Sequence, residues 1–149
     1  GPYGYAHDIS RTWMAEGTPD DRQRRLYAAC FEHVHRNMDL LEPGLSFLEL
    51  MEKGFCYSAE LAEQNFTTIF HGLGLENEWP IIMSPDKLHI PGAYGGGYDG
   101  VLEVGMTLCI ESYAGETGGP DGVKLEEMVL ITEAGAVPLG LTPYEEDWL

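Results

Sequence analysis

The 149-residue sequence has few basic residues and no long uninterrupted apolar segment. Lysine and arginine together number 8 against 25 aspartates and glutamates, which gives a formal net charge of −17 at pH 7. Such an excess of negative charge repels phosphate backbones, so we expect no nucleic-acid partner. No apolar run approaches a membrane span, and no basic segment followed by an apolar one marks the chain for export. We therefore expect a cytoplasmic protein with no membrane partner.

Cysteine is also scarce. The three cysteines, Cys30, Cys56 and Cys109, are odd in number and lack the Cys-x-x-Cys spacing typical of metal-binding pairs. We interpret them as reduced, mostly buried thiols of an intracellular protein. A catalytic cysteine is the less favoured interpretation, because nothing in the sequence marks one of them as activated.

The sequence also lacks an initial methionine, and residues 1–5 read as a turn with no strand before it. We interpret the chain as a piece of a longer protein. The alternative is that Gly1 and Pro2 remain from a cleavage, which still leaves the predicted strand that follows without an upstream partner.

Hydrophobic residues make up 44% of the chain, enough for one domain with a core of its own. Thr18 as a cap and Pro19 in the first helical position mark the start of the longest predicted helix. Helices are predicted over residues 19–41, 46–53 and 58–64. Strands are predicted over residues 5–13, 66–70, 107–113, 123–132 and 136–139. Residues 76–100 are predicted to be a long loop, and this order of elements favours an α+β fold.

The residues that carry most information are one histidine and three acids. His71 lies between an apolar run and two glycines, while Asp8, Glu111 and Glu126 each lie in a strand-like or apolar run. An ionised carboxylate there is costly unless something compensates its charge, and three carboxylates with one histidine suggest a cation. The alternatives are a core histidine with satisfied hydrogen bonds and strand acids that face solvent. His33 and His35, on the first helix beside Arg36, are predicted to face solvent.

Five stretches resemble, in the same order, the C-terminal half of the catalytic domain of the pita-bread metallopeptidase superfamily. This superfamily includes prolidases, aminopeptidase P and methionine aminopeptidase. The stretches are residues 4–12, 40–44, 71–75, 102–111 and 122–133. The resemblance implies that residues 1–149 are the C-terminal part of a single α+β catalytic domain with the pita-bread fold, truncated at its N-terminal side. It also implies two divalent metal ions, of Mn, Fe, Co or Zn.

Carried over from the resembling motifs, the metal ligands are Asp8, His71, Glu111 and Glu126. A further aspartate of the family's set is expected before residue 1. Adjacent strand residues face opposite ways, so only one of Glu126 and Glu127 can look into the site. Hydrophobic alternation alone would bury the face of Glu127, and it is the resemblance that selects Glu126.

The sequence departs from the proline-specific members at two histidine positions. Thr67 and Thr68 stand where one histidine is expected, and Asn77 stands where another belongs. Because an amide cannot shuttle a proton as imidazole does, ordinary prolyl peptidase activity is put in question. A branch that resembles dimethylsulfoniopropionate lyases replaces the second histidine by an aspartate that acts as base. Asn77, or Glu76 beside it, is therefore the candidate catalytic position.

Three functions remain open from the sequence. The first is a dimetal hydrolase of a small amide or dipeptide-like substrate, and the second is a carbon–sulfur lyase acting on a zwitterionic carboxylate. The third is a binding module without catalysis, which the retention of four metal-type residues disfavours. The intact protein is expected to be a homodimer with a small-molecule or dipeptide-like substrate.

Overall fold

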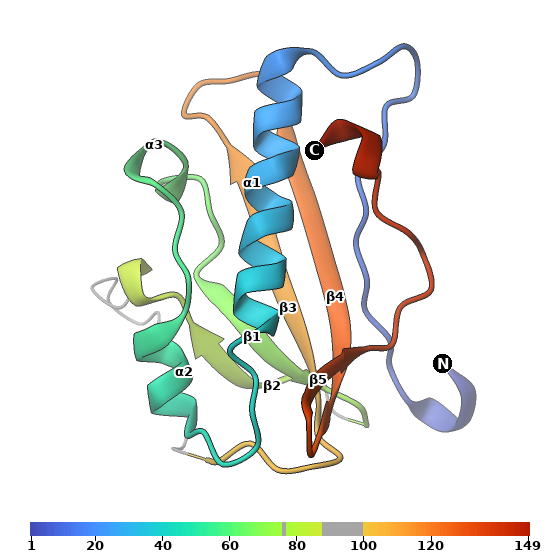
Figure 1. Ribbon diagram of the computed structural model, residues 1–149, viewed down its shortest axis with the longest axis vertical. Helices are drawn as coiled ribbons and strands as arrows, with labels where there is room; N and C mark the ends of the chain where they lie inside the picture. Colours follow the sequence, from blue (N-terminus) through green and yellow to red (C-terminus); the bar gives the residue numbers. More distant parts are fainter. Residues whose placement is uncertain (76, 88–99) are drawn as a thin grey trace.

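The computed structural model describes residues 1–75, 77–87 and 100–149. Within these residues a five-stranded antiparallel sheet has the strand order β2-β1-β3-β4-β5 (Figure 1). The strands are β1 (Thr68–Leu73), β2 (Asn77–Met83), β3 (Thr107–Gly115), β4 (Gly122–Thr132) and β5 (Gly135–Pro138). The helices are α1 (Asp21–Met38), α2 (Phe47–Lys53) and α3 (Ala59–Ala62), with 3-10 turns at Pro2–Gly4, Pro85–Lys87 and Glu146–Trp148.

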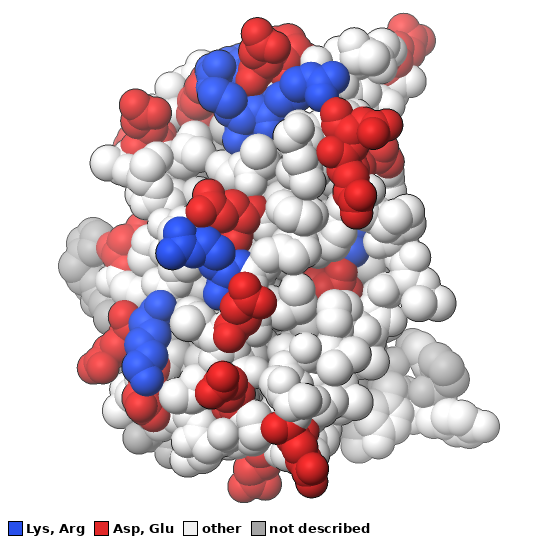
Figure 2. Space-filling view, viewed as in Figure 1, with Lys and Arg blue, Asp and Glu red and all other residues white. Residues whose placement is uncertain are grey.

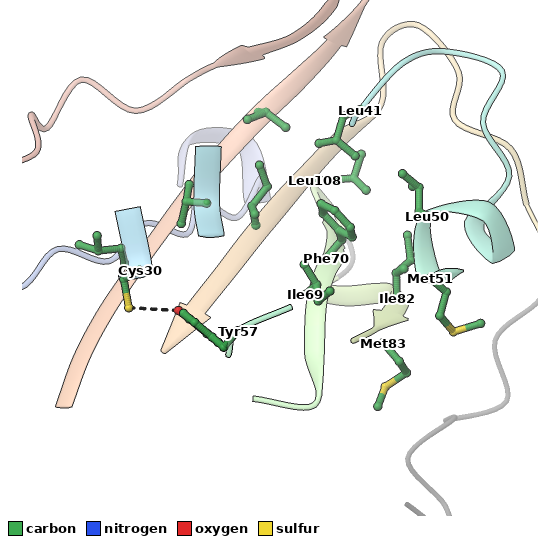
Figure 3. Close-up of a cluster of buried hydrophobic side chains, with 14 of the residues drawn as sticks. Cys30, Leu41, Leu50, Met51, Tyr57, Ile69, Phe70, Ile82, Met83 and Leu108 are labelled. Atoms are coloured by element: carbon green, nitrogen blue, oxygen red, sulfur yellow. Dashed lines mark hydrogen bonds between the residues drawn. The ribbon is translucent and has the colours of Figure 1, made fainter. Parts of the chain in front are cut away.

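The long helix α1 lies across one face of the sheet, over β3 and β4, and α2 lies beside it near β2 (Figure 1). Leu26, Cys30 and Val34 recur at intervals of four residues on α1, and all three are buried against the sheet. Figure 3 shows Phe70 and Leu108 of the sheet in the same cluster as Leu50 of α2. Burying each such side chain contributes about 1.5–3 kcal/mol, so this side of the sheet carries the main core.

Helix starts were predicted well at α2 and less well at α1. Ser46 and Glu49 form the expected capping box, and Gly54 ends the helix as predicted. At α1 the cap is Asp20, which accepts a hydrogen bond from the backbone of Gln23 at 2.8 Å, so the helix begins at Asp21. The prediction of a start at Thr18 and Pro19 was wrong, because a second capping box, Asp20 with Gln23, lies two residues further on.

Two strand predictions also need correction. Residues 5–13 were predicted as a strand, yet they form only an isolated bridge, between Ser10 and Glu126. They run in extended form beside β4, and the backbone N–H of Ala6 donates to Gly74 at 2.8 Å. Residues 76–100 were predicted as a loop, but β2 lies within them and pairs with β1. Residues 76 and 88–99 of this prediction lie outside the described residues.

His33 was predicted to face solvent, and this was wrong, because the side chain is fully buried. Its ring stacks on Tyr57 at a centroid distance of 4.5 Å, and burial lowers its pKa to about 4. Tyr57 in turn donates a hydrogen bond to the thiol of Cys30 at 3.3 Å (Figure 3). The Tyr57 hydroxyl also contacts the hydroxyl of Ser112. The α1 face of the sheet therefore holds a buried polar cluster beside its apolar core.

The surface over α1 carries acidic side chains across its whole extent, while basic ones gather in a few places (Figure 2). Cys30 and Cys109 are buried and Cys56 is half-buried, all as free thiols, which confirms the prediction of mostly buried cysteines. In the part of the chain that the structure describes, no helix combines the length and the apolarity that a bilayer crossing requires.

Candidate metal centre

The sheet face opposite α1 brings together the histidine and two of the acids that the sequence singled out. His71 on β1 lies opposite Cys109 on β3, and Glu111 on β3 lies opposite Glu126 on β4. Because side chains alternate along a strand, all four point to the same face. Their sequence neighbours belong to the core against α1: Phe70, Ile110 and Leu125.

Glu126 is the centre of this cluster and is fully buried. Its carboxylate accepts a hydrogen bond from Ser10 Oγ at 2.8 Å, lies 3.0 Å from Lys124 Nζ and lies 3.4 Å from His71 Nε2. Burial alone would raise the pKa of Glu126, but these donors outweigh it and hold the pKa well below its usual range. Glu126 is therefore a buried carboxylate that the surrounding donors keep ionised.

Lys124 connects the two glutamates. Its ammonium lies 3.0 Å from Glu111 Oε1 and 3.0 Å from Glu126 Oε2, so one cation bridges two carboxylates. Burial opposes its charge, yet the hydrogen bonds to Glu126 and Glu111 raise its pKa. The lysine thus stands as a cation at the point where the carboxylates of two strands converge.

Asp8 completes the group from the extended segment beside β4. Burial and then the charge of Glu126 raise the pKa of Asp8, and its carboxyl shares a hydrogen bond with Glu126. Burial would lower the pKa of His71, but its hydrogen bond to Glu126 outweighs this and the pKa is raised. The pKa is therefore raised for both groups, for Asp8 mainly by burial and for His71 by its hydrogen bond to Glu126.

The donor set fits a divalent cation. Asp8, Glu111 and Glu126 bring three negative charges when ionised and Lys124 brings one positive charge, so three minus one leaves two to be neutralised. Protons on Asp8 and His71, whose pKa values are raised, are one source of this remaining positive charge. A divalent ion is another source, and the ligands, one imidazole and several carboxylates, suit Mn, Fe, Co or Zn.

Cys109 is a member of the cluster that sequence reasoning treated only as a buried thiol. A nitrogen of His71, a carboxylate oxygen of Glu126 and Cys109 Sγ all lie within 4.8 Å of one another. Burial, followed by the charges of Glu126 and Asp8, raises the pKa of the Cys109 thiol. The signal was present in the sequence, because Cys109 precedes Glu111 by two residues and so shares its face of the strand.

Glu127 belongs to the other face of the sheet. Its carboxylate lies 2.5 Å from Arg11 Nη2, and it also accepts hydrogen bonds from the backbone of Gly140 at 3.1 Å and from Tyr144 at 3.2 Å. It is Glu126 that contacts His71 and Lys124, from the opposite face of the sheet. The geometry therefore places Glu126, and not Glu127, beside the other proposed ligands.

The backbone of Asn77 opens β2 and pairs with Leu73, two residues beyond His71. Glu76 lies outside the described residues.

The sequence model of metallopeptidase family M24 matches residues 1–133. The chain belongs to this family. The dimethylsulfoniopropionate lyase DddP of Roseobacter denitrificans is 40% identical over 97% of this M24 chain and 32% of its own length. The Xaa-Pro dipeptidase of Pyrococcus furiosus is 32% identical over 95% of this chain and 37% of its own length. The chain thus spans about a third of the length of these curated relatives.

Solved structures agree with the family. The prolidase from Pyrococcus furiosus superposes with a TM-score of 0.70 at 32% identity, over 95% of this chain and 39% of that one. The dipeptidase PepE from Mycobacterium ulcerans superposes with a TM-score of 0.75 at 26% identity, over 97% and 36%. The predicted pita-bread α+β fold is confirmed, and members of family M24 depend on divalent metal ions.

Proposed function

We propose that this chain carries most of the metal centre of an M24 enzyme, and that the reaction is carbon–sulfur elimination from a small zwitterionic carboxylate. The proposed ligands are Asp8, His71, Glu111 and Glu126, with a further aspartate from the part of the protein that precedes them. The crowding of carboxylates around Glu126 supports a metal at this place, because their charge exceeds what Lys124 neutralises.

Bound divalent ions supply Lewis-acid chemistry, in which they hold a substrate carboxylate and stabilise the negative charge that forms beside it. The chain's own residues prepare the place for this. Ser10 and Lys124 hold the Glu126 carboxylate in one orientation, and the sheet register fixes His71 and Glu111 on strands that cannot slip independently. The Glu76 carboxylate is the candidate base that would take the proton, whereas the amide of Asn77 would face the substrate.

Two observations favour elimination over peptide hydrolysis. The DddP lyases of Roseobacter denitrificans and Roseovarius nubinhibens are 40% and 37% identical to this chain, above the 32% of the Pyrococcus furiosus dipeptidase. The chain also has Thr67, Thr68 and Asn77 where proline-specific peptidases are expected to carry histidines. Without those imidazoles, the proton transfers of amide hydrolysis lack their usual groups.

Hydrolysis of a dipeptide-like substrate is the second candidate. The family model is that of metallopeptidases, and several relatives and solved structures are Xaa-Pro peptidases. Both candidates use the same metal centre. They differ in what the residues at the start of β2 do to the substrate.

The decisive experiment loads the intact protein with Mn²⁺, Fe²⁺, Co²⁺ or Zn²⁺ and assays two substrates in parallel. Release of dimethyl sulfide from dimethylsulfoniopropionate supports the lyase, and cleavage of an Xaa-Pro dipeptide supports the hydrolase. Binding of metal with neither activity would support the non-catalytic module and contradict the proposal. Absence of metal would overturn the metal centre itself.

Matched variants assign the roles. His71→Ala should remove metal and activity together, because it opens a coordination position. Asn77→Ala should change activity with the metal retained. Asn77→Asp should raise dimethyl sulfide release if a carboxylate there acts as base, whereas Asn77→His should raise dipeptide cleavage if the site is that of a lapsed peptidase.

A further inference from the structure

Cys109 lies beside His71 and Glu126 at one end of the proposed metal site, although the family resemblance carried over no ligand role for it. It is fully buried, and among the described residues its thiol makes one long hydrogen bond, 3.9 Å from Sγ to the backbone carbonyl of Asp8. This buried thiol has one weak hydrogen-bond partner and lies near the His71 ring and the Glu126 carboxylate. Its side chain points toward these proposed ligands.

The sheet register makes this placement robust. Cys109 pairs directly with His71 across β1 and β3, and Glu126 is its diagonal neighbour on β4, since Cys109 itself pairs with Met128. Directly paired and diagonal side chains on one face of an antiparallel sheet are the ones that can reach each other. A shift that removed Cys109 from the site would have to move His71 away as well.

The distances allow a shared ion. The thiol sulfur, a nitrogen of His71 and a carboxylate oxygen of Glu126 lie within 4.8 Å of one another, and the last two are 3.4 Å apart. Around one tetrahedral zinc, sulfur and nitrogen ligands at about 2.3 and 2.0 Å from the ion stand about 3.5 Å apart. The three side chains therefore need to close by only about 1 Å.

The two ends of the site also differ in character. Cys109 is packed with Leu73, Met128 and Ala6 in a small apolar cluster. Glu111 and Lys124, at the other end, are half-exposed and charged. One end is thus closed, apolar and contains sulfur, while the other is open and rich in oxygen. Sulfur ligands favour Zn²⁺, Co²⁺ and Cd²⁺ over the hard ions that oxygen ligands suit.

We propose that Cys109 is a metal ligand, which with His71 and Glu126 forms a thiolate-containing position for a borderline-soft divalent ion such as Zn²⁺ or Co²⁺. On binding, the thiol releases its proton to water and the sulfur takes the place of a water or carboxylate oxygen on the ion. This inference rests on the proposed function, because it adds a ligand to the same centre. It predicts a metal preference that the imidazole and carboxylates alone would not impose.

Cobalt provides the test, because thiolate bound to Co²⁺ gives a near-ultraviolet charge-transfer band that oxygen and nitrogen ligands lack. The intact protein loaded with Co²⁺ should show this band. Cys109→Ser should lose it while elemental analysis still finds cobalt. Cys56→Ser is the matched control and should keep it, since the Cys56 thiol contacts Gly54 and Ser84, neither of which is a proposed ligand. X-ray absorption of the zinc form should show one sulfur at about 2.3 Å.

Competition gives a quantitative readout. Cys109→Ser should reduce the ratio of Zn²⁺ to Mn²⁺ affinity by at least about tenfold, because a soft ligand is replaced by a hard one. Cobalt or zinc bound by the unsubstituted protein without a sulfur signal would overturn the role of Cys109 and leave the proposed function standing. No metal bound at all would overturn both.

Discussion

Glu126 and Glu127 are neighbours on β4, and both are almost fully buried, yet the two sides of the sheet treat them differently. Glu127 meets a complete set of donors from the chain itself: the guanidinium of Arg11, the backbone N–H of Gly140 and the hydroxyl of Tyr144. The guanidinium of Arg11 is itself fully hydrogen-bonded, because in addition to Glu127 it donates to three backbone carbonyls.

Glu126 is compensated by groups that it must share. Lys124 divides its charge between Glu126 and Glu111, and Asp8 competes with them for the same positive charge. Glu127 has hydrogen-bond donors that no other carboxylate uses, so its ion pair stabilises the fold. Glu126, Glu111 and Asp8 share the charge of one lysine, so this group retains affinity for another cation. The difference separates a structural ion pair from a candidate metal centre on adjacent residues.

The largest effect is expected on the structural side. Glu127→Gln leaves the buried guanidinium of Arg11 without its counter-charge, and breaking a buried pair in this way costs about 3–5 kcal/mol of stability. Chemical denaturation of the intact protein measures it. Glu32→Gln, in the exposed pair with Arg36, is the control and should cost less than about 0.5 kcal/mol. Equal losses in both variants would mean that Glu127 is not a structural anchor.

A pH effect on the α1 face should follow. The pKa of His33 is about 4 in the fold against 6.5 for the free side chain. Between these values the unfolded state binds the proton and the folded state does not. The stability that neutral His33 contributes is therefore complete above pH 6.5 and is lost as the pH falls toward 4, by up to about 3 kcal/mol.

His33→Phe keeps a ring against Tyr57 and removes the titration. The variant should lose less stability than the unsubstituted protein as the pH falls from 6.5 to 4, as measured by denaturation at a series of pH values. An unchanged slope would show that other groups on this face cause the acid sensitivity.

Glu126→Gln should act on the metal more than on the fold. Removing a charged ligand should weaken divalent-metal binding by about 100-fold or more, about 2.7 kcal/mol, as isothermal titration can measure. The metal-free protein should lose less stability than it does with Glu127→Gln, because the change also relieves repulsion from Asp8 and Glu111. If Glu127→Gln weakened metal binding and Glu126→Gln destabilised the metal-free fold, the proposed roles of the two glutamates would be reversed.

Ser10→Ala should have the smallest effect. It removes the hydrogen bond of 2.8 Å from Ser10 to Glu126 and leaves all the proposed metal ligands in place. A hydrogen bond to a charged group contributes about 1.5 kcal/mol or somewhat more, so metal affinity should fall by about tenfold. Thr12→Ala, on the same segment but bonded to the backbone of Lys124, is the control and should change metal affinity little.

Local signals predicted much of the fold. The spacing of Leu26, Cys30 and Val34 marked the buried face of α1, and Ser46 with Glu49 marked the start of α2. β3 and β4 were predicted nearly to their ends. β2 was missed because Pro80 breaks the pattern of a strand, although as part of an edge strand of the sheet its missing N–H is tolerated.

The candidate site was predicted in part, and by resemblance more than by pattern. His71, Asp8, Glu111 and Glu126 were identified from motifs, and the structure brings them together. Cys109 was missed although it precedes Glu111 by two residues and so shares its face of β3. The bridging role of Lys124 was missed as well. Hydrophobic alternation would have buried Glu127 and exposed Glu126, and in fact both faces of β4 are covered there.

The sequence by itself determined the helices and most of the strands of the sheet, although not β2, because capping residues and apolar periodicity act over a few residues. It also determined the α+β class and, through its motifs, the family. Only the tertiary structure decided which carboxylate is satisfied by the chain and which remains available for a cation. That depends on the register between strands and on Arg11, Lys124 and Ser10, whose reach across β4 no local pattern encodes.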